Sequence, residues 1–455
     1  MITLNEIELA KHCIWTALEA GASAARASLS KSTMDSCTML NGEMDKVSHS
    51  ADSSIYLYIF ADGKYGTFST NRLEKEELEA FVINAIKMVR MLGEDLCRRL
   101  PEPERTAKDA VTGLELGLYD RRYGETTTED RIEKARRMSI FKETAQEPDK
   151  YTVISEECEY SESYDDNYII DSQGFEGRQT ESTFSCFSEL TIEDCEGNKY
   201  SGYWWGSSPY KDEIDIEGCS RCALKKAVDQ IGPQKRRSGK YRMVVDTNVA
   251  SRLVSPILNA LNAAAVQQKM SFLEEAVGVK VFPEGMTLMD NARTYGKAGA
   301  RLFDSEGVAT RDTAVIQNGV VMQFFVNTYM SEKMGMEPTV EDISRPCMLP
   351  YIKAKDAVSE KKDVTLKDIL RHCDNGIYVT GFNGGNCNPV TGDFSYGVEG
   401  FAFSRGKITH PVKEMLITGN ILELWNRLVA VGSDARPGVR WQIGTLAFKD
   451  VSFSA

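Results

Sequence analysis

Histidine is the residue type that says most about metal chemistry in this chain of 455 residues. Only four are present: His12, His49, His372 and His410. They are scattered, so the sequence contains no local HExxH or HxH frame that would place two imidazoles on one metal ion. A zinc site assembled from distant residues stays open as an alternative. Each histidine by itself is predicted to be a surface or capping residue.

Nucleophile and phosphate-binding motifs are also missing from the sequence. It contains no GxSxG elbow, no GxxxxGK[ST] loop and no GxGxxG fingerprint. Cys373 directly follows His372, but neighbours in one element usually point in different directions, whereas a catalytic pair must face each other. No self-contained catalytic constellation is predicted, and an independent hydrolase with an unrecognised site remains one alternative.

The cysteines are numerous but irregularly spaced. There are eleven, an odd number, and they are predicted to be reduced thiols and not a disulfide framework. One pair, Cys219 and Cys222, has CxxC spacing within a predicted helix. A redox or zinc role would need a second ligand pair or a thioredoxin-like strand–helix junction. Neither is visible, so ordinary packing is predicted for this pair.

The charge balance excludes several partners. Lys and Arg number 54 against 67 Asp and Glu, which gives a formal net charge of −13. Such a surface repels phosphate backbones and anionic membranes, so neither nucleic acid nor membrane is expected to bind. No stretch approaches the roughly 20 apolar residues of a membrane helix. The opening residues MITLNEIELAKHC lack a basic leader with an apolar core, so a cytoplasmic protein is expected.

Two polar segments flanked by glycine are candidate contact sites. The first precedes Gly307, and the second lies in a glycine-rich stretch over residues 381–400. Both can be read simply as tight turns, because glycine permits conformations that other residues avoid. The alternative is that they contact a peptide or a partner protein. The candidate residues are Asp304, Ser305, Glu306, Gly384, Gly385, Thr391, Gly392, Asp393 and Ser395.

In the N-terminal half, the periodicity of apolar residues and the turn residues predict helices and hairpins. Residues 1–100 are predicted to form an α+β domain, with amphipathic helices at 4–21 and 74–92. Asn41-Gly42 and Asp62-Gly63 predict hairpins between these helices. Residues 101–232 are predicted as a strand-rich middle region in which a helix at 128–144 precedes the strands. This region is either separate from the first domain or forms one N-terminal lobe with it.

The C-terminal half is predicted as a separate strand-rich domain over residues 240–455. A polar, glycine-flanked linker precedes it. A strand at 241–245 and a helix at 250–265 come first, and Asn318-Gly319 and Arg405-Gly406 predict later hairpins. Repeated strand–helix–strand crossovers are missing, so the fold class is predicted to be α+β with antiparallel sheets.

Several short segments together resemble the TldD/PmbA family, and more closely its PmbA (TldE) branch. The resemblance covers nearly the whole chain and is most specific over residues 240–435. The segments that carry it are Lys269–Leu273, Asp304–Gly307, Thr391–Ser395, Gly400-Phe401, Pro411-Val412, Gly419–Ile421 and Val431–Asp434, with Ala20–Ala24 and Ser30–Ser32 near the N-terminus.

The resemblance implies that two different subunits have different roles, one with the catalytic zinc and one without it. TldD and TldE form a heterodimer that degrades or trims unstructured peptides, and the TldD subunit carries the zinc on an HExxxH helix and a cysteine near its C-terminus. The corresponding helix here, Leu253–Leu261, has no histidine and no glutamate, and the last cysteine is Cys387. The resemblance therefore implies a zinc-free, non-catalytic subunit without a cofactor of its own.

Partners follow from the same resemblance. A TldD-like zinc subunit is the expected heterodimer partner, an unfolded peptide the expected substrate, and a homodimer the expected state of the chain alone. Peptide hydrolysis is expected only in the complex. Family members are also named modulators of DNA gyrase, so the alternative is a regulatory protein that acts through protein contact without peptidase activity. The net negative charge argues against direct contact with DNA.

Overall fold

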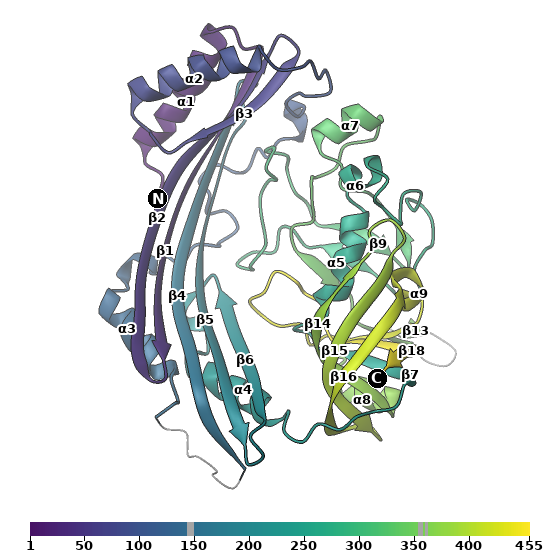
Figure 1. Ribbon diagram of the computed structural model, residues 1–455. Helices are drawn as coiled ribbons and strands as arrows, with labels where there is room; N and C mark the ends of the chain where they lie inside the picture. The colour runs from purple at the N-terminus through teal and green to yellow at the C-terminus, as the bar shows by residue number, and fades with distance from the viewer. Residues whose placement is uncertain (143–149, 354–357, 360–362) are drawn as a thin grey trace. The chain divides into compact units, whose positions relative to one another are not determined.

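The computed structural model describes residues 1–142, 150–353, 358–359 and 363–455 (Figure 1). The chain forms two compact units. The first comprises Met1–Val228 together with Arg293–Thr310 and Asn327–Glu341, and the second comprises the remaining segments, Asp229–Ala292, Arg311–Val326 and Asp342–Ala455. Two later segments thus belong to the first unit. The predicted α+β class with antiparallel sheets is confirmed.

The first unit is built on one long antiparallel sheet of order β3-β2-β1-β4-β5-β6. Asn41-Gly42 and Asp62-Gly63 join its first three strands, and all four residues have positive φ, as tight hairpin turns require. The pairing of β1 with β4 unites the predicted N-terminal and middle regions in one sheet. The strands are β1 (Ala24–Leu40), β2 (Glu43–Ala61), β3 (Lys64–Thr70), β4 (Tyr151–Asp171), β5 (Glu176–Asp194) and β6 (Lys199–Ser208).

Two helices cover one end of this sheet, and both were predicted. α1 (Leu4–Glu19) begins at Thr3, which forms a capping box with Glu6, and α2 (Lys75–Val89) packs beside it. Their apolar sides bury a core against β1 and β2. This core includes Ala10, Ile14, Leu29, Leu57, Val82 and Ile86.

Two further helices cover the other end of the same sheet face. α3 (Thr128–Met138) and α4 (Ile216–Val228) pack over a core that contains Cys37, Cys158, Cys186 and Cys219. The CxxC residue Cys219 is therefore a packed side chain, as predicted. α3 is shorter than the predicted helix 128–144, because Ser139 adopts an extended backbone and ends it. Residues 143 and 144 of that prediction lie outside the described residues.

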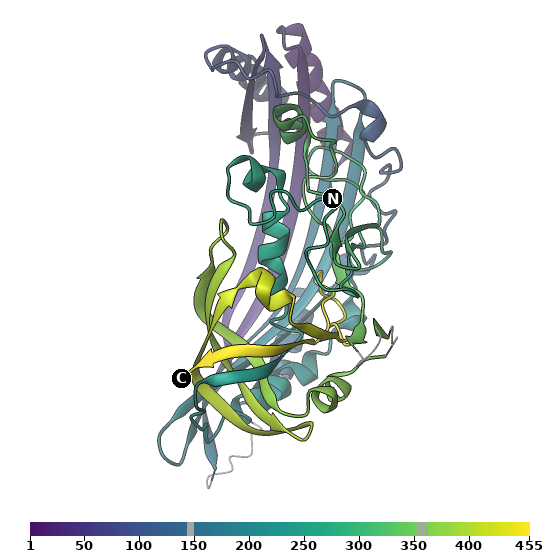
Figure 2. The same cartoon turned by 90° about the vertical axis from the view of Figure 1, so that its right-hand side faces the viewer.

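The second unit is built on a ring of strands. β14 (Gly376–Cys387), β15 (Asp393–Ser404) and β16 (Lys407–Asn420) form an antiparallel meander, and β7 (Gly239–Val245) lies parallel to β14. β18 (Leu446–Ser454) pairs with both β16 and β7, which closes the ring; Figure 2 shows the teal β7 beside the yellow β18. β17 (Leu428–Val431), β12 (Tyr351–Lys353) and β13 (Val358–Ser359) extend the sheet from β18.

Smaller elements complete the second unit. A short sheet has the order β10-β9-β8-β11, and α8 (Leu366–Cys373) packs on a core beside β7. The remaining strands and short helices are β8 (Leu288–Asp290), β9 (Thr313–Gln317), β10 (Val320–Val321), β11 (Pro346–Met348), α6 (Ala263–Gln267) and α9 (Ile421–Trp425), and α7 (Thr328–Met334) belongs to the first unit.

The predicted helix 250–265 is divided in two. α5 (Ser251–Ala260) ends at Leu261, and Asn262 then caps α6 by accepting a hydrogen bond from the Ala264 N–H. Because an asparagine side chain competes for nearby backbone groups, it favours the start of a helix over its interior.

Among the described residues, no helix is both long enough and apolar enough to span a lipid bilayer.

Candidate functional site

Helix α5 presents one apolar and one polar side. Leu253, Val254, Ile257 and Leu258 are buried, as the helical repeat of apolar residues requires. The opposite side carries Arg252, Ser255, Pro256 and Asn259, which are exposed or half-buried. The indole N–H of Trp425, on α9, donates a hydrogen bond to the Leu253 carbonyl at 3.1 Å and holds the buried side in place.

The hairpin of β14 and β15 lies over the polar side of α5. Gly384 and Gly385 form a bulge in β14, with φ of +61° and +76°. A Cβ on Gly385 would lie 1.8 Å from the Ser395 carbonyl oxygen, whereas a Cβ on Gly384 would meet nothing within 4 Å. Gly385 is therefore required by close approach within the hairpin.

The turn that joins these strands is stabilised by side-chain hydrogen bonds, one within the turn and one from Asn420 at the end of β16. Thr391 donates a hydrogen bond to a carboxylate oxygen of Asp393 at 2.7 Å, and the Asn420 amide donates to the other at 3.1 Å. These two bonds, that from Thr391 first, lower the pKa of Asp393. Gly392 has φ of +77°. In this turn Thr391 and Asp393 are exposed and Gly392 is buried, and Asp393 pairs with Asn420 at the end of β16.

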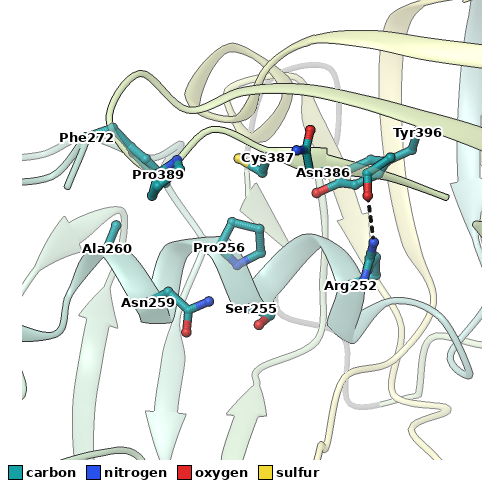
Figure 3. A pocket seen from close by; sticks show the side chains of 11 residues that line it. Arg252, Ser255, Pro256, Asn259, Ala260, Phe272, Asn386, Cys387, Pro389 and Tyr396 are labelled. Atoms are coloured by element: carbon teal, nitrogen blue, oxygen red, sulfur yellow. Dashed lines mark hydrogen bonds between the residues drawn. The ribbon is translucent and has the colours of Figure 1, made fainter. Parts of the chain in front are cut away.

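A pocket of about 240 Å³ lies between the hairpin and α5 (Figure 3). The guanidinium of Arg252 lies 5.3 Å from the centre of the Tyr396 ring and donates a hydrogen bond to the Gly385 carbonyl at 3.1 Å. Pro256 lies opposite Cys387. The other lining residues are Ser255, Asn259, Ala260, Phe272, Asn386 and Pro389.

The other predicted segment, Asp304 to Glu306, belongs to the first unit, and its side chains form hydrogen bonds within that unit. Asp304 is 2% exposed and accepts hydrogen bonds from the backbone N–H groups of Glu306, Val308 and Glu341, at 2.9–3.1 Å. Ser305 donates a hydrogen bond to the Glu341 carboxylate at 2.6 Å. Glu306 accepts hydrogen bonds from the backbone and hydroxyl of Thr328, both at 2.8 Å. Together they fasten residues 327–341 to this turn.

Burial also changes the chemistry of Asp304. It raises the pKa of this carboxyl to about 7, with the nearby Glu341 and Glu306 carboxylates acting in the same direction. The backbone hydrogen bonds oppose this shift but do not cancel it.

The structure therefore separates the predicted candidates into two groups. Gly384, Gly385, Thr391, Gly392, Asp393 and Ser395 share one hairpin in the second unit, and Asp304, Ser305 and Glu306 share one turn in the first. Sequence reasoning missed the pocket residues Arg252, Asn259 and Tyr396. For Arg252 and Asn259 the signal was the polar spacing at positions 252, 255 and 259, which places polar groups on one side of a helix. Tyr396 lies on β15 and has no such signal.

Family models match most of the chain. Those described as PmbA/TldA metallopeptidase domain 1, central domain and C-terminal domain match residues 25–89, 122–231 and 238–455. The chain belongs to the PmbA/TldD family. The predicted resemblance is thereby confirmed.

Relatives of the PmbA/TldD family match along the full length. The chain is 22% identical to the metalloprotease PmbA of Escherichia coli O157:H7, covering 100% of this chain and 99% of that protein. It is 37% identical to a Bacteroides thetaiotaomicron protein, a candidate modulator of DNA gyrase, whose crystal structure covers 100% of both chains with a TM-score of 0.92. TldE of Thermococcus kodakarensis, at 18% identity and a TM-score of 0.78, shares the fold.

The zinc centre that the PmbA/TldD resemblance implies for TldD does not fit the donors present here. The polar side of α5 carries arginine, serine, proline and asparagine, and the pocket's one thiol, Cys387, has a pKa raised by burial and by the Asp393 carboxylate. Zinc is held by imidazole, thiolate and carboxylate groups, usually three or four together. Within the described part of the chain, no three His, Cys, Asp or Glu residues are grouped to hold a metal ion.

None of the four histidines lines the pocket. His12 on α1 pairs with Glu79 on α2 at 2.6 Å, and His49 on β2 pairs with Asp35 at 2.8 Å. His372 lies on α8, where burial and the Arg242 charge lower its pKa. His410 lies on β16. Among the described residues, none of these histidines belongs to a group of three metal-ligating side chains.

Proposed function

We propose that this chain is the zinc-free, non-catalytic subunit of a two-component metallopeptidase that degrades or trims unfolded peptides. The catalytic zinc would belong to a TldD-like partner subunit. The observation that carries the proposal is the side-chain set of α5. The position where the family resemblance expects an HExxxH helix has arginine, serine, proline and asparagine on its polar side.

The lack of metal-ligating side chains on α5 also argues against peptide hydrolysis by this chain alone. Metal-assisted peptide hydrolysis needs metal ligands, an open position for water and a general base. α5 offers no imidazole and no carboxylate, so the hydrolytic groups would have to come from the partner. This chain would contribute binding surface to the complex, including the hairpin of β14 and β15.

The proposal is tested by reconstitution. The purified chain, a TldD-like protein with an HExxxH helix from the same genome, and an equimolar mixture are each incubated with an unfolded peptide, and cleavage is followed by mass spectrometry. We expect cleavage by the mixture and none by this chain alone. Cleavage by this chain alone, at a rate unaffected by the other protein, would reject the proposal.

A second candidate function is regulation through protein contact. It is favoured by the full-length, 37% identical structure described as a candidate modulator of DNA gyrase. A net charge of −13 disfavours direct binding to DNA, so such an effect would act on the gyrase protein. Supercoiling assays with the purified chain distinguish the two: a change in gyrase activity without any peptidase partner supports the regulatory function.

A further inference from the structure

The pocket between α5 and the β14–β15 hairpin has the chemistry of a small anion-binding site. Its floor and walls combine one cation, Arg252, with the polar side chains of Ser255, Asn259 and Asn386. Within the described residues, Arg252 has no carboxylate partner within salt-bridge distance, although the chain as a whole carries an excess of acids. An arginine that lines a pocket and has no carboxylate partner is suited to bind an anionic ligand.

Arg252 is also held in a defined position. One of its N–H groups is used by the Gly385 carbonyl, and the guanidinium lies over the Tyr396 ring, which is 2% exposed. A guanidinium has five N–H donors in a planar fork. Because only one contact to a protein oxygen is formed, other donors remain for a ligand. Fixing the side chain beforehand reduces the entropy that binding would otherwise cost.

Three uncharged polar side chains in the pocket are available to form hydrogen bonds with a ligand. The side chains of Ser255, Asn259 and Asn386 form no hydrogen bonds to other described residues, although all three line the pocket. A carboxamide presents one acceptor and two donors, which matches the N–H and C=O of a peptide unit. Phe272, Pro256 and Pro389 supply apolar surface for a ligand side chain.

The size of the pocket selects among anionic ligands. A volume of about 240 Å³ lies below the roughly 300–1,000 Å³ of cavities that hold drug-sized ligands. It therefore suits the end of a chain better than the middle of a long segment. A carboxylate next to a peptide unit is the group that satisfies the arginine and the carboxamides together.

We propose that this pocket binds the C-terminal carboxylate of an extended peptide, with Arg252 on the carboxylate and Asn259 and Asn386 on the last peptide unit. The inference deepens the proposed function, because it names which end of the peptide this subunit would hold. It requires no catalysis by this chain. Binding can therefore be tested without the zinc subunit, and failure of the peptidase assay would not be mistaken for failure of the pocket.

The test uses the full-length chain and fluorescence anisotropy. The probe is a short, unfolded Gly/Ser/Ala-rich peptide with an N-terminal fluorophore, made once with a free C-terminal carboxylate and once as the C-terminal amide. We expect the free acid to bind about tenfold more tightly than the amide, which is the range of a charge-assisted pair. Equal affinity for both, or no binding of either, would overturn the proposal.

Variants assign the effect to the pocket. Arg252→Gln should bind the acid as weakly as the amide, whereas the matched control Arg311→Gln, an exposed arginine of the same unit outside the pocket, should keep the preference. Asn386→Ala should weaken both peptides by a similar factor. If Arg252→Gln lowers the melting temperature, Arg252→Lys, which keeps the charge, should retain part of the preference. An acid preference that survives in Arg252→Gln would contradict the assignment.

Discussion

The carboxyl group of Asp304 is buried and accepts three backbone hydrogen bonds, two from its own turn and one from Glu341. The sequence alone allowed either a contact residue or a simple turn at this position. Its burial favours a structural role, so replacing Asp304 by alanine should lower stability together with any activity. Asp393 differs, because its side chain is exposed, and its replacement should therefore cost less stability than that of Asp304.

The raised pKa of Asp304 predicts a pH-dependent stability. Its pKa rises from 3.8 when unfolded to about 7 when folded, so its neutral form is favoured in the native state. The associated stability is complete below about pH 4 and decreases as the pH rises through 7, by at most about 4 kcal/mol. Asp304→Asn should flatten this part of the curve of melting temperature against pH. Asp393→Asn is the control, and an Asp304→Asn curve parallel to that of the wild type would contradict the prediction.

The elements of the fold were largely predictable because their signals are local. The Asn-Gly and Asp-Gly pairs predicted the hairpins, and the apolar repeats predicted α1 and α2, since turn conformation and helix amphipathicity depend on neighbours in sequence. The pairing of β18 with β7, which closes the ring of the second unit, joins residues about 200 positions apart and has no local signal. The pocket likewise joins α5 to residues 385–396, which lie far along the chain, so its residues could not be assembled from the sequence.

The two glycines in the bulge of β14 should differ in how much stability their replacement by alanine costs. Gly385→Ala places a Cβ against the Ser395 carbonyl and also strains a positive φ, so it should destabilise the second unit by about 2–4 kcal/mol. Gly384→Ala has the same backbone strain but open space, and should cost only about 1 kcal/mol. Chemical unfolding of both variants measures the difference. Equal losses would mean that the close approach at Gly385 is not rigid.

The whole molecule carries the fold of a metallopeptidase family but lacks the donors of a zinc centre on α5. A chain that retains such a fold without the catalytic groups would act through an interface with another subunit. Stable interfaces of this kind usually bury more than about 1,000 Å². The excess of acidic residues would also favour neutral or basic peptides over acidic ones.

This argument predicts the assembly state. The chain alone should form a homodimer with twice the 50.7 kDa chain mass, and a heterodimer should replace it when the TldD-like protein is added. Light scattering coupled to size exclusion measures both species. A 50.7 kDa species that persists after mixing would rule out the proposed partnership.

The zinc content of the purified chain tests the central claim most directly. After expression with zinc and dialysis against a weak chelator, metal analysis should find far less than one zinc per chain, because α5 presents no imidazole or carboxylate. A Cys219→Ala/Cys222→Ala variant excludes incidental binding at the CxxC pair. About one tightly held zinc per chain, retained in that variant, would contradict the assignment as a zinc-free subunit.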